Sequence, residues 1–207
     1  MASCGFGAFV TALMILVISL AATIVAILTD NWYMVEPEGG AVVSEMEKRE
    51  NTYSFGFWRR CYDDQPASLS PTGQLDNDGR DYLSRSYIGL SLASAAAQLA
   101  TIITLLCGAW PGDCKRMRKV SLYACALGVL VFAILTSIAS GVCFIAARDV
   151  ETDDLHLYRG LDTEYGWSFM LHWIGAGLTV VDGFLLMGMM RYTHEDVGVL
   201  QRDYYNM

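Results

Sequence analysis

The polar stretch that decides the fold contains YSFGFWRRC, at residues 53–61, and Trp32 stands at the end of the apolar segment before it. These residues are aromatic and β-prone, and Gly56 interrupts them. They lie in the only long polar part of a chain that is otherwise dominated by apolar segments. We therefore expect a small sheet here, held in place by the rest of the chain.

Four apolar segments cover residues 6–28, 87–110, 120–147 and 165–190, and Asp182 is the only charged residue within them. Each exceeds the roughly 18–20 residues that cross the hydrocarbon core as a helix. With 54% hydrophobic and 17% charged residues, the chain of 207 residues leaves no room for a separate soluble domain. The sequence predicts one all-α membrane domain over residues 1–207: a four-transmembrane-helix bundle with a small extracellular antiparallel β-sheet from the first outer loop.

Basic residues near helix ends stay cytoplasmic, and the linker between the second and third segments carries Lys115, Arg116, Arg118 and Lys119. We therefore expect both termini and the tail at residues 191–207 in the cytoplasm, with outer loops at 29–86 and 148–164. The first segment has no basic region before it and no small-residue cleavage site after it. We expect it to be a retained helix of a multi-pass plasma-membrane protein.

The first outer loop is patterned. Residues 41–48 and 52–62 have the branched and aromatic content of two strands, joined as a hairpin across residues 49–51. Residues 65–80 are rich in Pro, Ser, Gly, Asn and Asp, which indicates a flexible excursion.

Small residues recur at four-residue spacing in the second and third segments: Ser91 with Ala95, Ala93 with Ala97, and Ala133, Ser137 and Gly141. Such faces let helices approach closely in lipid, where packing drives association. We expect them to pack tightly within the membrane and to be available to helices of a partner. Gln98 is expected to form an interhelical hydrogen bond.

Asp182 carries two hypotheses. A charged residue near the centre of a membrane helix is costly and should face protein, so it either makes a satisfied polar contact within the bundle or engages a polar group on a partner's helix. By depth, Thr11, Thr101 and Thr104 are its candidate partners within the chain.

Trp32 and Cys61 also leave alternatives open. Trp32 is either an anchor in the headgroup region or the packing partner of Trp58. Among six cysteines, only Cys61 is plainly extracellular. It is a buried or unpaired thiol, pairs with another chain, or reaches Cys143.

Several function classes are not expected. The chain shows no Ser/His/Asp set, metal-ligand spacing or phosphate loop, and its three histidines (His156, His172 and His194) are too far apart to converge. We therefore expect no enzyme, catalytic residue, cofactor or metal. A net charge of −8, with acids clustered in two loops, argues against nucleic acid. One acidic residue and no broken-helix pair argue against a transporter.

The chain resembles the claudin superfamily, which also holds the peripheral-myelin-type proteins and the calcium-channel γ and AMPA-receptor regulatory subunits. The superfamily's outer-loop signature is a Trp, then Gly-Leu-Trp, then two Cys, and Trp32, Gly56, Phe57, Trp58 and Cys61 stand for all but the last. In relatives the two cysteines form a disulfide across the strands. The second Cys is missing here, which either leaves the sheet less stable locally or moves that role to the packing of Trp32 on Trp58.

Further motifs resemble the γ-subunit and stargazin-like receptor-regulatory branch. Residues 29–32 (TDNW) and 56–61 (GFWRRC) are similar to its Thr-Asp-x-Trp and Gly-Leu-Trp-Arg-x-Cys. Residues 165–169 (YGWSF) are similar to the start of its fourth helix, and Asp81, Tyr82, Leu83 and Arg85 to the acidic-Tyr-Phe-x-Arg before its second. Asp182 echoes the acidic residue of its fourth helix, shifted by about two positions.

The resemblance implies two candidate functions. The first is a non-enzymatic auxiliary subunit of an ion channel or ionotropic receptor, such as a glutamate receptor or calcium channel, with Asp182, Tyr165 and Trp167 as candidate partner contacts. The second is a claudin-like adhesion or junction protein. Membrane lipid and self-association complete the expected partners. The first is favoured because a pore needs a line of charges, whereas Lys48 and Arg49 interrupt the acids Glu45, Glu47 and Glu50.

Overall fold

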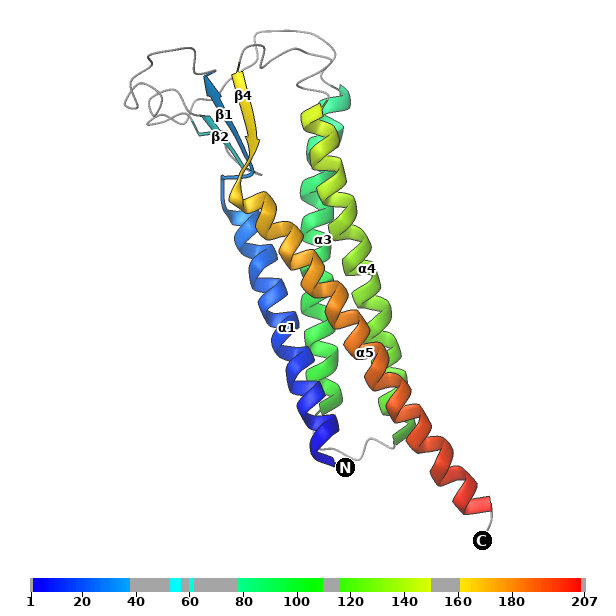
Figure 1. Cartoon of the computed structure of the whole chain (residues 1–207). Helices are drawn as coiled ribbons and strands as arrows, with labels where there is room; N and C mark the ends of the chain where they lie inside the picture. The colour runs from blue at the N-terminus through cyan, green and yellow to red at the C-terminus, as the bar shows by residue number, and fades with distance from the viewer. Residues whose placement is uncertain are drawn as a thin grey trace. The chain divides into compact units, whose positions relative to one another are not determined.

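The computed structural model describes residues 2–37, 53–56, 60–61, 78–109, 116–149 and 161–205. Within these residues it has four helices (Figure 1): α1 (Ala2–Leu28), α3 (Asp78–Ala109), α4 (Arg116–Asp149) and α5 (Trp167–Tyr205). Each contains a stretch long and apolar enough to cross a membrane. The expected fold class, four membrane-crossing helices with a small antiparallel sheet, is confirmed.

The helices extend beyond the apolar segments of the sequence. α3 begins at Asp78, so residues 78–80 are helical and not part of a flexible excursion. α5 continues to Tyr205 through the segment expected to be a tail. The apolar segments mark only what lipid can cover, whereas a helix continues into polar residues as long as its backbone hydrogen bonds are satisfied.

The described strands form one antiparallel sheet in the order β3-β2-β1-β4. β1 (Tyr33–Pro37) is central and pairs with β2 (Tyr53–Phe55) and β4 (Leu161–Tyr165), while β3 (Arg60–Cys61) pairs with β2. Figure 1 shows β1 and β4 side by side. The predicted strand at residues 52–62 is therefore two short strands, and the strand predicted at 41–48 lies outside the described residues.

Two strands were not expected from the sequence. β1 follows directly after Trp32, and β4 (LDTEY) comes from the second loop, so Tyr165 ends a strand and does not open the last helix. β4 contains Asp and Glu, which are depleted in strands. Its five-residue register with β1, from Tyr33 opposite Tyr165 to Pro37 opposite Leu161, supplies the pairing that its own composition does not predict.

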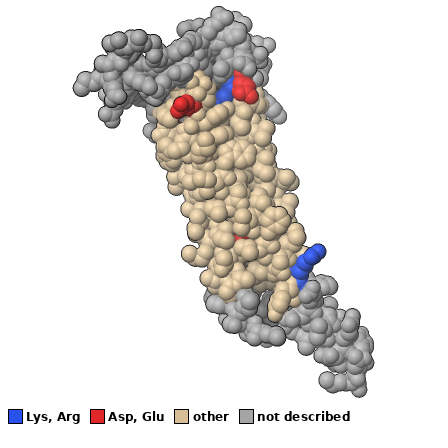
Figure 2. Space-filling view, in the orientation of Figure 1, with Lys and Arg blue, Asp and Glu red and all other residues tan. Residues whose placement is uncertain are grey.

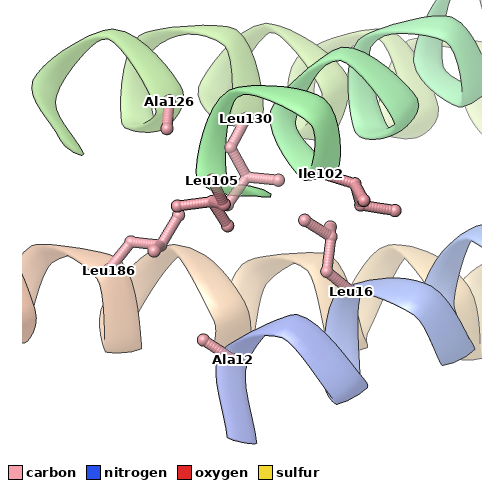
Figure 3. Packing of buried hydrophobic residues seen from close by; sticks show 7 residues of the cluster. All are labelled: Ala12, Leu16, Ile102, Leu105, Ala126, Leu130 and Leu186. Carbon is pink, nitrogen blue, oxygen red and sulfur yellow. The ribbon is translucent and has the colours of Figure 1, made fainter. Parts of the chain in front are cut away.

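The contacts divide the chain into two compact units. We call residues 1–21, 93–136 and 175–207 the helical unit, and residues 22–92 and 137–174 the sheet unit. In the helical unit, apolar side chains converge from all four helices (Figure 3), and the cluster consists of Ala12, Leu16, Ile102, Leu105, Ala126, Leu130 and Leu186.

The outer faces of the helices are apolar. Phe132 is 53% exposed and Phe184 is 69% exposed, and most of the described surface in Figure 2 carries neither acidic nor basic side chains. In water such faces would favour aggregation. In a bilayer they are solvated by lipid tails, so the surface agrees with the membrane-crossing assignment.

The small-residue faces of α3 and α4 pack inside the protein. In the helical unit, Ser94 Oγ donates to the Ala133 carbonyl oxygen at 2.9 Å. In the sheet unit, the hydroxyls of Ser91 and Ser140 lie 2.5 Å apart, and a Cβ added to Gly141 would lie 2.7 Å from the Trp173 ring. These small residues pack on neighbouring helices, as expected. Contact of the same faces with a partner's helices stays a prediction.

Candidate partner-contact site

Trp32 is the centre of the sheet unit. Its side chain is fully buried, and its indole nitrogen donates to the Ala26 carbonyl oxygen at 2.5 Å. Its ring lies 4.9 Å from that of Phe144, 6.0 Å from that of Phe169 and 5.3 Å from that of His172, measured between centroids. A fully buried ring has no contact with headgroups, so the anchor hypothesis is wrong. The indole instead joins the end of α1 to α4 and α5.

The expected partner of Trp32 lies outside the described residues. Phe57 and Trp58 are not described, and neither is the side chain of Cys61. The structure shows that Phe144, Phe169 and His172 surround Trp32, which leaves the packing of Trp58 on Trp32 a prediction. Cys143 is a free, half-buried thiol, so the alternative in which Cys61 reaches Cys143 is wrong.

Gly56 is required by the backbone that passes beside it. A Cβ at this position would overlap the Cα of Asp30 and lie 2.9 Å from the Asp30 Cβ. Real Cβ atoms do not approach that closely, so any larger residue would separate β2 from the end of α1. The glycine of the outer-loop motif is thus explained by a close approach of two chain segments.

The junction between β4 and α5 is held by hydrogen bonds on both sides. The amide of Gly166 donates to the Trp32 carbonyl oxygen at 2.9 Å, and the amide of Ser168 donates to the Asn31 carbonyl oxygen at 3.1 Å. Thr29 Oγ1 also donates to Ser168 Oγ at 2.7 Å. The two amide bonds satisfy N–H groups that a helix N-terminus leaves without intrahelical partners. Together the three bonds fix the backbone that carries Tyr165 and Trp167.

Tyr165 and Trp167 are exposed on this fixed backbone. Tyr165 is 37% exposed; its ring stacks on Phe169 at 4.5 Å and meets Tyr33 edge-on at 5.5 Å. Trp167 is 50% exposed. The junction therefore presents two large aromatic side chains on a fixed backbone, and stacking also holds the Tyr165 ring.

Arg148 is a residue that sequence reasoning misplaced. It was assigned to the second outer loop, but it lies in the last turn of α4 and is buried. Its guanidinium carbon lies 5.3 Å from the centroid of Phe144 and 5.7 Å from that of Tyr33. A cation over aromatic faces is stabilising, and a basic residue also suits a helix C-terminus. The preference of basic residues for helix C-termini was the sequence signal that could have placed Arg148 in α4.

Charges nearby affect the Tyr165 hydroxyl. Burial, followed by the neighbouring Asp149 carboxylate and Tyr33, raises the pKa of Tyr165 above its ordinary value of 10.0, while Arg148 acts in the opposite direction. Tyr165 therefore remains a neutral hydrogen-bonding phenol at physiological pH.

The remaining predicted residues lie apart from this junction. Arg85 is exposed on α3, two positions before Tyr87, whose ring packs on Phe144 at 5.3 Å. His172 was noted only as one of three scattered histidines, yet its Nε2 lies 3.1 Å from the Ser137 carbonyl oxygen. Among the residues that the structure describes, no group of three His, Cys, Asp or Glu side chains could hold a metal ion.

Asp182 belongs to the helical unit and is fully buried. Its expected partners bond to their own helices: Thr11 Oγ1 to the Gly7 oxygen, Thr101 Oγ1 to the Ala97 oxygen and Thr104 Oγ1 to the Ala100 oxygen. Neither carboxylate oxygen has a hydrogen-bond partner among the described residues. The satisfied contact expected with those threonines is therefore wrong. Engagement of a partner's helix by this fully buried side chain stays a prediction.

Gln98 behaves as expected. Its side chain is buried and lies within hydrogen-bond distance of Ser19 on α1, with Ser19 Oγ 3.3 Å from Gln98 Oε1. Ser19 Oγ also lies 2.6 Å from Thr179 Oγ1 on α5. We call Ser19, Gln98 and Thr179 the polar layer of the helical unit.

The fold and these contacts define a class, a multi-pass membrane protein whose four apolar helices carry a small antiparallel sheet joined to them through buried aromatic residues. The chain belongs to the family described as PMP-22/EMP/MP20/Claudin tight junction, which matches residues 17–188. No individual curated protein matches the chain. The superfamily expected from Trp32, Gly56 and Cys61 is confirmed, and the branch within it remains a prediction.

Proposed function

We propose that this protein is a non-enzymatic auxiliary subunit of a plasma-membrane ion channel or ionotropic receptor, modulating its gating and trafficking. The observation that supports this proposal is the pair of exposed aromatic residues, Tyr165 and Trp167, on the fixed junction between β4 and α5. The branch resemblance of residues 165–169 points to the same junction.

The junction has the properties of a contact site for a partner. Trp and Tyr are enriched among the few residues that carry most of the energy of protein interfaces. Stacking on Phe169 and the two backbone hydrogen bonds restrict Tyr165 and its neighbours before binding. Less conformational entropy is then lost on association, so a small exposed area can bind usefully.

The outer faces of the helices favour packing over conduction. Figure 2 shows an almost uncharged surface on the described helices, which suits lipid or the helices of another protein. We place the sheet outside the cell and both termini inside, as the basic linker indicates. The auxiliary subunit then meets its partner beside the outer membrane surface.

The test is co-purification from plasma membrane with channel or receptor subunits. Trp167→Ala should reduce recovery of the partner by about tenfold or more if this ring is an interface hot spot, at unchanged surface level. Phe184→Ala is the matched control, because Phe184 is even more exposed but lies in the helical unit. Equal recovery with both variants would contradict a contact at the junction.

The functional readout follows from the same variants. Expressed alone, the protein should give no new current; expressed with its channel partner, it should change gating kinetics or surface number, and Trp167→Ala should weaken that change. An epitope placed in residues 38–52 should be accessible on intact cells. Accessibility only after permeabilisation would reverse the proposed orientation.

A second candidate is adhesion at cell junctions, which the description of the matching family favours because it names tight junction proteins. It predicts continuous strands at contacts between transfected cells and altered paracellular charge selectivity, with only copies of this chain recovered on purification. That result would replace the auxiliary-subunit proposal.

A further inference from the structure

Asp182 is a buried acidic side chain without a compensating group among the described residues of the helical unit. The side chain is 0% exposed, and both carboxylate oxygens lack a hydrogen-bond partner among the described residues. A buried carboxylate is strongly unfavourable unless a positive charge or several donors accompany it. The group is therefore neutralised either by its own proton or by a cation bound beside it.

The position of Asp182 on α5 shows which side chains a cation bound beside it would meet. Thr179 is three residues before Asp182 and Leu186 four residues after it, so the three share one helix face. Thr179 contacts Ser19 in the polar layer, and Leu186 belongs to the apolar cluster in Figure 3. Asp182 therefore points into the helical unit, between the polar layer and the apolar cluster.

Along its sequence, α3 also runs from the polar layer to the apolar cluster, as α5 does. Gln98 belongs to the polar layer and Leu105 to the apolar cluster, and the fully buried Thr101 lies between them. Since one helical turn separates Thr101 from Gln98 and Asp182 from Thr179, the Thr101 hydroxyl and the Asp182 carboxylate belong to one level of the helical unit.

The hydroxyls at these levels use their hydrogens elsewhere. Thr101 Oγ1 donates to the Ala97 oxygen at 2.9 Å, and Thr179 Oγ1 to the Gly175 oxygen at 2.9 Å or to Ser19 Oγ at 2.6 Å. A hydroxyl has one hydrogen and two lone pairs. Thr101 and Thr179 therefore have lone pairs, and not hydrogens, to offer a further partner.

Protein cations are also distant among the described side chains of the helical unit. Among these side chains the basic residue is Arg191, which is exposed and lies nine positions along α5 from Asp182. At 1.5 Å per residue this is about 13 Å along the helix axis. The Asp182 level thus combines one buried carboxylate with neutral oxygens, without a positive partner from this part of the chain.

We propose that Asp182, with the hydroxyl oxygens of Thr101 and Thr179, binds one sodium ion inside the helical unit. A hard cation takes carboxylate and neutral oxygen ligands. One monovalent ion neutralises one carboxylate, whereas the described residues offer no cluster of acids for a divalent ion. The ion would join α5 to α3 and stabilise the helical unit.

The experiment is a thermal unfolding series on the full-length protein in detergent, at constant ionic strength, with sodium replaced by N-methylglucamine. A ligand that binds only the folded state raises Tm as its concentration increases. We expect sodium to raise Tm by roughly 3 °C for each tenfold increase above its dissociation constant, and the organic cation to give no rise. Equal Tm values in sodium and N-methylglucamine would refute the proposal.

Three variants locate the ion. Asp182→Asn keeps the shape of the side chain but removes its charge, so the sodium-dependent rise should disappear. Thr101→Val should shift the sodium dependence to at least tenfold higher concentrations. Thr104→Val is the matched control, because Thr104 likewise donates to its own helix, to the Ala100 oxygen at 2.8 Å, but is only half-buried and lies one residue before the core residue Leu105. It should behave as wild type.

A direct measurement keeps the proposal testable if the variants do not fold. Binding of radioactive sodium to the purified wild-type protein should saturate at one ion per chain and be displaced by unlabelled sodium but not by N-methylglucamine. Absence of saturable binding, or a sodium-dependent rise in Tm that persists in Asp182→Asn, would show that Asp182 holds no ion.

Discussion

The amide of Gly166 donates to the Trp32 carbonyl oxygen at 2.9 Å, which joins the start of α5 to the end of α1 across more than a hundred residues of sequence. The same glycine lies against Asn31: an added Cβ would overlap the Asn31 carbonyl oxygen. The two ends meet only because position 166 has no side chain, so this contact sets the geometry of the proposed partner site.

Gly166→Ala should therefore destabilise the sheet unit. Backbone must move to admit the methyl group, and overpacking of this kind costs about 1–3 kcal/mol. The matched control is Gly177→Ala on the same helix, where an added Cβ meets nothing within 4 Å and helix propensity favours Ala by up to about 1 kcal/mol. In thermal unfolding in detergent, Tm should be lower for Gly166→Ala and not for Gly177→Ala. Equal Tm values for the two variants would show that the junction admits the methyl group without loss of stability.

Trp32 and Trp167 offer the same residue type in opposite roles. Trp32→Ala leaves a void among Phe144, Phe169 and His172 and should cost about 3–5 kcal/mol of unfolding free energy. Trp167→Ala removes a half-exposed ring and should change stability by less than about 0.5 kcal/mol. Surface level measured for both variants separates the roles: Trp32→Ala should be retained inside the cell, and Trp167→Ala delivered normally. Normal delivery of Trp32→Ala would contradict the packing role.

Sequence reasoning recovered what depends on lipid and missed what depends on pairing. An apolar run long enough to cross a bilayer is visible in the chain itself, so all four helices were expected. β4 contains Asp162 and Glu164 and becomes a strand only through β1, a partner about 125 residues away in the chain. For the same reason Arg148 resembled a loop residue until Phe144 and Tyr33 were placed around it.

The candidate site shows the same division. Tyr165 and Trp167 were singled out because a motif carries them, but their exposure depends on the β4–α5 junction, which no local pattern predicts. Asp182 was expected to face protein, and it does. Its threonine partners were chosen by depth alone, and depth does not reveal that each hydroxyl would bond to its own helix.

Cys143 should react as a thiol. It is a free cysteine in the structure, so alkylation of the denatured protein without reductant should modify it, as mass spectrometry of the peptide containing Cys143 can measure. Cys143→Ser should leave Tm nearly unchanged, since no crosslink is lost. A peptide that is modified only after reduction would instead show a disulfide and restore the pairing with Cys61 or another cysteine.

Tyr165 should make the stability of the sheet unit fall in alkaline solution. Burial, with Asp149 and Tyr33, raises the pKa of the folded phenol above 10.0, so the unfolded chain releases this proton first as the pH increases. Deprotonation then favours the unfolded chain. The free energy of unfolding should be constant in this respect below about pH 10 and should fall from there until the folded-state pKa is passed.

The absorbance of ionised tyrosine at alkaline pH, compared between wild type and Tyr165→Phe, measures this residue separately from the other tyrosines. Tyr165→Phe should also reduce the alkaline loss of stability, because the phenol that titrates is gone. Arg148→Met removes the charge that lowers the pKa of Tyr165, so the phenol should then ionise at still higher pH. If Arg148→Met left the ionisation unchanged, the guanidinium would act only through packing on Phe144 and Tyr33. If Tyr165→Phe kept the full alkaline slope, another group would be its source.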